Sequence, residues 1–188
     1  MAVGEHLEAA DQTAAIVVVG GSALSVRGWV DRVTKDVDVI ALAAEEDGRR
    51  ILVSAQPLPE HLLQAVRRVA RDYSLADDWM NSVIGAQWKL GLPRGFEQEI
   101  QWRRFHALEV GFAGRNSIIA LKLFATVDQG RESVHSQDLV RLHPTESELR
   151  TAAEWVRGQD AGEAFPALLE ETLGHVRDSL AGRHRGSS

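Results

Sequence analysis

Two aspartates, Asp36 and Asp38, have the residue type and spacing in this sequence that most directly suggest chemistry. Both lie in residues 34–41, an expected strand in which Val37 and Val39 face the opposite side, and their Cα atoms would be ~7 Å apart. Two carboxylates at that separation can hold Mg²⁺ together with the phosphate oxygens of a nucleotide. The alternative is an exposed strand face that carries two solvated aspartates.

A glycine-rich turn precedes this acidic segment. The β-branched residues 16–19 indicate a buried strand that ends at Gly20 and Gly21, and a short helix is expected after Ser22. Glycines let a backbone approach a ligand closely, and a strand-to-helix turn is a common place for a phosphate. Ser22 adds a hydroxyl donor and is also a candidate cap of the helix. The alternative is an ordinary turn, since neither a Walker lysine nor the GxGxxG spacing is present.

Apolar spacing and turn signals predict the other elements. Helices are expected over residues 5–15, 57–72, 118–127, 137–142, 145–157 and 163–180, strands within residues 98–112, and a loop or helix start at residues 77–81. Thr145 and Glu148 form a capping-box pattern, and Asn116 or Ser117 is expected to cap the helix over residues 118–127. This order indicates an α+β (α/β-like) fold, a small mixed sheet flanked by helices with a carboxy-terminal helical segment.

Lys122 is a further candidate because it lies on a predicted helix among the apolar residues Ile118, Ile119 and Ala125. Lysines are seldom buried without a partner, so a carboxylate or a cleft is expected near it. The alternative is a surface lysine whose ammonium group reaches water.

Two stretches of the sequence resemble a known family. Residues 19–24, Arg27 and residues 34–39 resemble the first motif of minimal nucleotidyltransferases with the polymerase-β-type fold. In particular they look like the bacterial nucleotidyltransferases related to the AbiEii abortive-infection toxins, and like the uncharacterised single-domain proteins near them. Residues 78–81 look like a segment of that uncharacterised group.

A later stretch carries the second part of the resemblance. Residues 119–125, Arg131 and the pair Asp138-Leu139 are similar to the downstream lysine-helix and aspartate motif of these proteins. The whole resemblance spans about residues 16–142. It implies a nucleotidyltransferase-like domain over residues 1–142 and a helical appendage over residues 143–188, whose tail from residue 181 is expected to be flexible.

The resemblance implies transfer of a nucleoside monophosphate from an NTP to a tRNA or protein acceptor. Gly20, Gly21, Ser22, Arg27 and Lys122 would bind the nucleotide. Asp36 and Asp38 would bind Mg²⁺ or Mn²⁺, and the catalytic set would be Asp36, Asp38, Lys122 and Asp138.

The third carboxylate of such a site is open between Glu109 and Asp138. The resemblance also extends to a toxin–antitoxin or phage-defence role with an antitoxin or regulator as partner. The alternative is a catalytically inactive protein of the same fold that binds a nucleotide or a protein.

Composition narrows the class of protein. The net charge of −6 gives no global basic field for nucleic acid, and the absence of cysteine excludes disulfides and thiolate chemistry. Residues 1–12 lack the pattern of a signal peptide, and no apolar run approaches the ~20 residues that span a membrane. We expect a soluble, cytoplasmic protein that does not enter a membrane.

Overall fold

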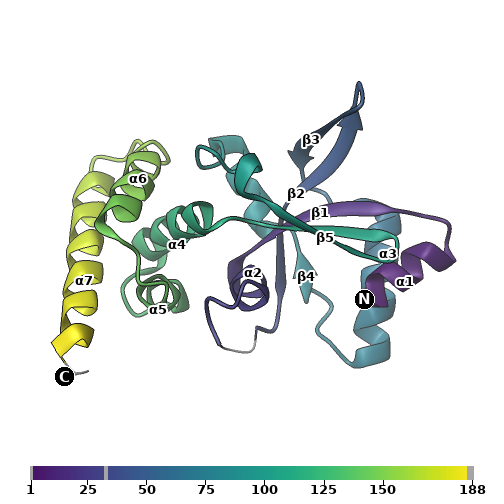
Figure 1. The fold of residues 1–188 in the computed structure, drawn as a ribbon, viewed down its shortest axis with the longest axis horizontal. Coiled ribbons are helices and arrows are strands. Elements are labelled where there is room, and N and C mark those ends of the chain that lie inside the picture. The colour runs from purple at the N-terminus through teal and green to yellow at the C-terminus, as the bar shows by residue number, and fades with distance from the viewer. Residues whose placement is uncertain (1, 32–33, 186–188) are drawn as a thin grey trace. The chain divides into compact units, whose positions relative to one another are not determined.

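The computed structural model describes residues 2–31 and 34–185 of the chain, which divides into two compact units. Met1–Leu92 and Glu97–Ala113 form the first, here called the sheet unit, and Pro93–Phe96 and Gly114–Ser188 form the second, the helical unit. Figure 1 shows the elements of both, and each unit is described by itself. The domain boundary expected after Leu142 stays a prediction.

The sheet unit is built on a mixed six-stranded sheet, as the sequence predicted. Its path is β3-β2-β1-β6-β5, with β4 beside β2. The central strand β1 pairs antiparallel with β2 and parallel with β6, and this combination makes the sheet mixed. The strands are β1 (Ala14–Val19), β2 (Val37–Glu46), β3 (Arg49–Ser54), β4 (Met80–Asn81), β5 (Gln101–Phe105) and β6 (Leu108–Phe112).

The helices of the sheet unit are α1 (Ala2–Ala9), α2 (Gly20–Val26) and α3 (Glu60–Tyr73), with short 3₁₀ segments at Val83–Leu90 and Glu97–Glu99. The buried side chains of α3 recur at helical spacing, as predicted, and include Leu62, Val66 and Val69. Those of β1 run from Ile16 to Val19 without a break. A strand buried on both faces fits its position in the middle of the sheet.

The helical unit contains α4 (Arg115–Gln129), α5 (Val134–Arg141), α6 (Glu146–Arg157) and α7 (Phe165–Arg185). Leu123, Leu139, Leu149 and Leu169, one from each helix, are fully buried and form its core. Helix α4 is in contact with each of the other three. No helix in the described part of the chain is both long enough and apolar enough to cross a membrane.

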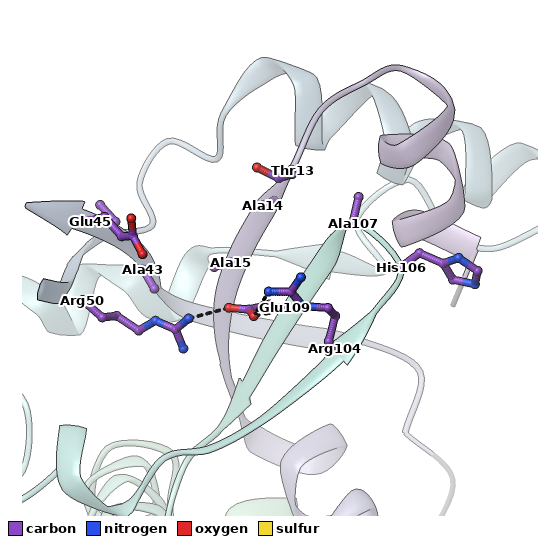
Figure 2. A pocket seen from close by; sticks show the side chains of 11 residues that line it. Thr13, Ala14, Ala15, Ala43, Glu45, Arg50, Arg104, His106, Ala107 and Glu109 are labelled. Atoms are coloured by element: carbon purple, nitrogen blue, oxygen red, sulfur yellow. Dashed lines mark hydrogen bonds and ion pairs between the residues drawn. The ribbon is translucent and has the colours of Figure 1, made fainter. Parts of the chain in front are cut away.

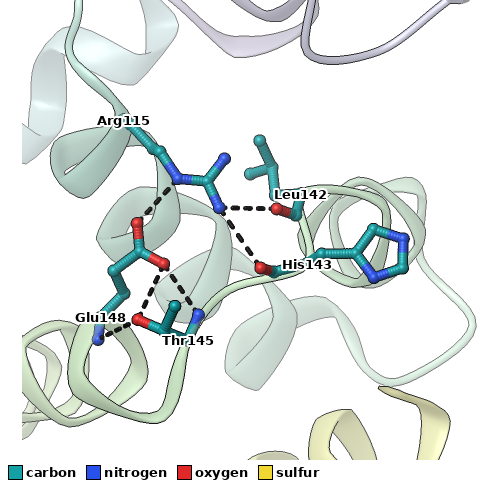
Figure 3. Close-up of polar contacts among 5 residues, drawn as sticks. All are labelled: Arg115, Leu142, His143, Thr145 and Glu148. Carbon is teal, nitrogen blue, oxygen red and sulfur yellow. Dashed lines mark hydrogen bonds and ion pairs between the residues drawn. The ribbon is translucent and has the colours of Figure 1, made fainter. Parts of the chain in front are cut away.

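The predicted capping box at the start of α6 is confirmed. The Thr145 hydroxyl accepts a hydrogen bond from the Glu148 amide at 3.2 Å, and the Glu148 carboxylate accepts one from the Thr145 amide at 2.7 Å. Figure 3 shows that the same carboxylate receives Arg115 Nε at 2.7 Å, while another nitrogen of that guanidinium donates to the Leu142 carbonyl at 2.6 Å. The side chain of Arg115 therefore joins α4 to the α5–α6 connection.

The bounds of several elements differ from the predictions. The helix expected over residues 5–15 is α1, which ends at Ala9, because residues 14 and 15 belong to β1. Helix α4 begins after Gly114, so neither Asn116 nor Ser117 caps it, because the chain leaves β6 in an extended conformation that turns at the glycine. Of residues 77–81, the first three form a turn and a bend, which fits the loop alternative, and Met80 and Asn81 form the short strand β4, since Met80 pairs with Val37. Helix α7 continues to Arg185, so the part of the expected flexible tail from residue 181 to 185 is helical, and residues 186–188 lie outside the described residues.

Candidate functional site

The glycine turn stands at the end of β1, directly against the acidic segment. Val19 is the partner of Asp38 in the β1–β2 register, and α2 begins at the next residue, Gly20. Gly20 has φ +69°, and a Cβ placed on it would overlap Oδ2 of Asp38. Glycine is therefore needed here for two reasons, the left-handed backbone and the close approach of the carboxylate.

Asp36 lies one residue before β2, not within it as the predicted strand over residues 34–41 required. Its carbonyl accepts hydrogen bonds from the Ser22 hydroxyl at 2.6 Å and the Thr34 hydroxyl at 3.1 Å. The Thr34 hydroxyl also lies 3.2 Å from Oδ1 of Asp36. These hydroxyl donors take the place of a strand partner for the Asp36 carbonyl, so β2 begins one residue later, at Val37. The bond from Ser22 also keeps Asp36, whose side chain is exposed, near the glycine turn.

Ser22 connects the glycine turn to the acidic segment. It is buried in the first turn of α2, and its bond to the Asp36 carbonyl spans fourteen positions of the chain. The residue that precedes α2 is Val19, and no side chain caps the helix, so the expectation that Ser22 acts as a cap was wrong. The hydroxyl instead fixes the distance between the turn and the acidic pair.

Arg27 lies at the opposite end of α2 from the glycines. Since α2 has seven residues, the two ends are ~10 Å apart. The Arg27 guanidinium donates to the side chain of Gln101 at 2.5 Å and stacks over Trp29 with 4.6 Å to the ring centroid. The structure thus brings Gly20, Ser22, Asp36 and Asp38 together, while the main contacts of Arg27 are elsewhere.

Lys122 and Asp138 face each other inside the helical unit. Nζ of Lys122 is 2.9 Å from Oδ2 of Asp138, and the two side chains are 5% and 0% exposed. Nδ1 of His135 lies 3.2 Å from the same Nζ. The expectation of a carboxylate partner for Lys122 is confirmed, and the alternative of a surface lysine is wrong. The catalytic roles expected for Lys122 and Asp138 stay predictions.

Glu109, the other candidate third carboxylate, does not join the acidic pair. It is the partner of Ala15 in the β1–β6 register, four residues before Val19, which corresponds to ~13 Å along the strand. Its carboxylate binds Arg104 and Arg50, each at 2.6 Å. The hydrogen bonds from Arg104, against a smaller opposing effect of burial, hold the pKa of Glu109 below its usual value of 4.5, and the charge of Arg50 adds to this.

The donor set at the glycine turn fits a metal ion that is shared with a nucleotide. Among the described residues, no group of three histidine, aspartate or glutamate side chains is placed to hold a metal ion. Asp36 and Asp38 offer hard oxygen ligands of the kind that Mg²⁺ prefers, and Mg²⁺ commonly completes its shell with phosphate oxygens and water. The pair is therefore suited to a metal that arrives with a triphosphate.

The structure places two further side chains, Thr34 and His135, beside candidate residues. A threonine two positions before an aspartate is a recognised signal for a local hydroxyl-to-backbone bond, so Thr34 could have been found. The position of His135 beside Lys122 depends on how α4 and α5 pack, for which the sequence carries no local signal.

Comparison with protein families identifies the family of the chain. The family described as nucleotidyltransferase of unknown function (DUF6036) matches residues 2–147. No curated protein and no solved structure matches the chain. The family match spans the strand–glycine–helix turn, the acidic pair, Lys122 and Asp138, which are the same residues on which the resemblance to minimal nucleotidyltransferases rests. This chain therefore belongs to a family of nucleotidyltransferases.

Proposed function

We propose that this protein is a Mg²⁺-dependent enzyme that transfers a nucleoside monophosphate from an NTP to an acceptor. The observation that carries the proposal is the fit between Gly20 and Asp38, where a carboxylate oxygen takes the volume that any side chain would fill. Asp36 is held beside this turn by the Ser22 and Thr34 hydroxyls. The acidic residues and the glycine turn are thus next to each other.

The chemistry follows from these neighbours. Asp36 and Asp38 would hold Mg²⁺, which supplies positive charge to the phosphate oxygens when it is bound. The glycine turn lets the triphosphate lie against the backbone. An acceptor hydroxyl then forms a bond to the α-phosphorus as the bond to the pyrophosphate oxygen breaks, pyrophosphate leaves, and the hydroxyl proton passes to solvent.

The acceptor and the biological role enter the proposal through the resemblance to AbiEii-related proteins. We propose a tRNA or protein acceptor, and a place as the toxin or effector of a toxin–antitoxin or phage-defence module with an antitoxin or regulator as partner. Lys122 is proposed to contact the phosphates and Asp138 to support it. In the structure these two residues bind each other, so a phosphate contact requires Lys122 to share or leave Asp138.

A second function is favoured by one observation. Glu109 is bound to two arginines ~13 Å along the sheet, so within the sheet unit it does not complete a set of three carboxylates with Asp36 and Asp38. A protein with only the acidic pair at this turn would bind a nucleotide or a protein partner without transfer.

Transfer of label from α-³²P-labelled NTPs to total tRNA or protein, with Mg²⁺ or with EDTA, tests the proposal. Asp36→Asn and Asp38→Asn should each lower transfer about a hundredfold or more, since metal ions stabilise such reactions by several kcal/mol. Asp47→Asn, at the β2–β3 turn, is the matched control and should transfer at the wild-type rate. Unchanged transfer in Asp38→Asn would refute the metal assignment, and NTP binding without transfer in the wild type would identify the binding module.

A further inference from the structure

A second hollow lies on the same face of the sheet as Asp38, at the opposite end of β1. It has a volume of about 380 Å³, within the range of small-molecule pockets, and all of its lining residues belong to the sheet unit. Figure 2 shows Arg50, Arg104 and Glu109 side by side along its edge. We call it the arginine hollow.

The arginines of this hollow are held in place before any ligand arrives. Glu109 accepts from Arg50 on one carboxylate oxygen and from Arg104 on the other. The Arg50 guanidinium also stacks on the Trp102 ring, 4.3 Å from its centroid. Each guanidinium has five N–H donors, so both retain donors after binding Glu109. Two guanidinium groups held in this way are suited to bind the oxygens of a phosphate.

Alanines make up most of the rest of the lining. Ala15 is the register partner of Glu109, so both point to the same side of the sheet. Leu42 is the register partner of Ile16, so the next residues, Ala43 and Ala15, both face the opposite side of the sheet from that pair. Ala43 therefore points to the same side as Ala15 and Glu109. Alanines on two adjacent strands leave the depth that larger side chains would fill, which gives a planar group a floor.

The charges around the hollow discriminate between ligands. Arg50 and Arg104 exceed Glu109 by one positive charge, which favours an anionic group on that side. The exposed Glu45 on β2 adds an acceptor at another part of the lining, which disfavours a purely anionic ligand. His106 also lines the hollow, and its imidazole binds Glu8 on α1 at 3.0 Å. A matching ligand carries a phosphate at one end and neutral N–H donors on a flat ring at the other.

We propose that the arginine hollow binds a nucleoside 5′-monophosphate, with the phosphate on Arg50 and Arg104 and the base over Ala15 and Ala43. The base donates hydrogen bonds to Glu45. This site is separate from the proposed metal site, since ~13 Å of β1 lies between Glu109 and Asp38. It needs no metal ion, because arginines supply the positive charge.

Isothermal titration of the full chain in EDTA tests this site while no divalent ion is available to the acidic pair. The probes are AMP, GMP, CMP, UMP and inorganic phosphate. At least one monophosphate should bind saturably and more tightly than phosphate. Arg104→Ala and Arg50→Lys should each weaken that binding about tenfold, because charge-assisted hydrogen bonds are lost. Arg104 is 73% exposed, so its loss should leave the melting temperature close to that of the wild type.

Arg103→Ala is the matched control, since Arg103 is adjacent in β5 but lies over Phe112 on the other face. It should bind like the wild type, and so should Asp38→Asn. Equal weakening in Arg103→Ala, loss of binding in Asp38→Asn, no saturable binding, or phosphate binding as tight as any nucleotide would each overturn the proposal. The label-transfer assay depends on Mg²⁺ and Asp38, so the two proposals can fail independently.

Discussion

Asp38 of the sheet unit and Asp138 of the helical unit are the same residue type in opposite environments. Asp38 is half buried at the end of a strand, against a glycine that leaves it room. Asp138 has no exposed surface and holds the ammonium group of Lys122 at 2.9 Å. Asp38 keeps exposed surface beside the glycine turn, whereas a buried carboxylate such as Asp138 mainly balances the charge buried with it. Burial and partners, more than residue type, separate the two.

The largest expected effect concerns the buried pair. Asp138→Ala leaves the ammonium of Lys122 buried without its carboxylate, and should lower the free energy of unfolding by about 3–5 kcal/mol. Asp38→Ala should change it by no more than about 1 kcal/mol. Urea unfolding followed by circular dichroism measures both. Equal stabilities of the two variants would remove the distinction drawn between the two aspartates.

The double variant Lys122→Met, Asp138→Leu sharpens this prediction. It replaces both charges by apolar groups and should regain most of the stability that Asp138→Ala loses, because no charge stays buried alone. A double variant as unstable as Asp138→Ala would mean that the loss reflects damaged packing between α4 and α5.

An intermediate effect is expected at the glycine turn. Gly20→Ala forces an alanine into a left-handed conformation and against Asp38, at a cost of about 2–4 kcal/mol. Gly28→Ala is the matched control, since Gly28 has φ +70° but nothing within 4 Å, and should cost about 1–2 kcal/mol. Of the two positions, Gly20 is the one at which an added Cβ would meet Asp38. Thermal unfolding should rank them, and identical stabilities would contradict the close approach.

The smallest effect is expected at Glu109, which is 22% exposed. Its pKa is below the usual 4.5, chiefly because Arg104 donates hydrogen bonds to it. A carboxylate of this kind stabilises the folded state above the pKa of the unfolded chain, and the contribution is lost as pH falls through the folded-state pKa. The wild type should therefore lose more stability than Glu109→Gln between about pH 6 and about pH 3. The measurement is the free energy of unfolding of both proteins in urea at each pH, and an equal loss in the wild type and Glu109→Gln would contradict this prediction.

Local pattern was sufficient for many elements of the fold. The β-branched run of β1, the apolar spacing of α3 and the capping box at Thr145 and Glu148 each act through neighbours in the chain, and all three are found. Strand β3 was missed, because its partner is β2 and its residues carry no alternation strong enough to predict it alone. Strand β4 was missed for a similar reason, since two residues form a strand only by pairing with Val37 and Asp38.

For the site, the sequence by itself determined which residues are candidates. The glycines, Ser22, Asp36 and Asp38 lie within nineteen positions of one another, close enough for chain connectivity to suggest a shared turn. The tertiary structure decided the rest. Register set Asp38 against Gly20, the bond from Ser22 held the Asp36 carbonyl so that β2 begins one residue later, and packing of α4 with α5 buried Lys122 against Asp138. Register and burial depend on contacts between residues far apart in the chain, and a local pattern does not encode those contacts.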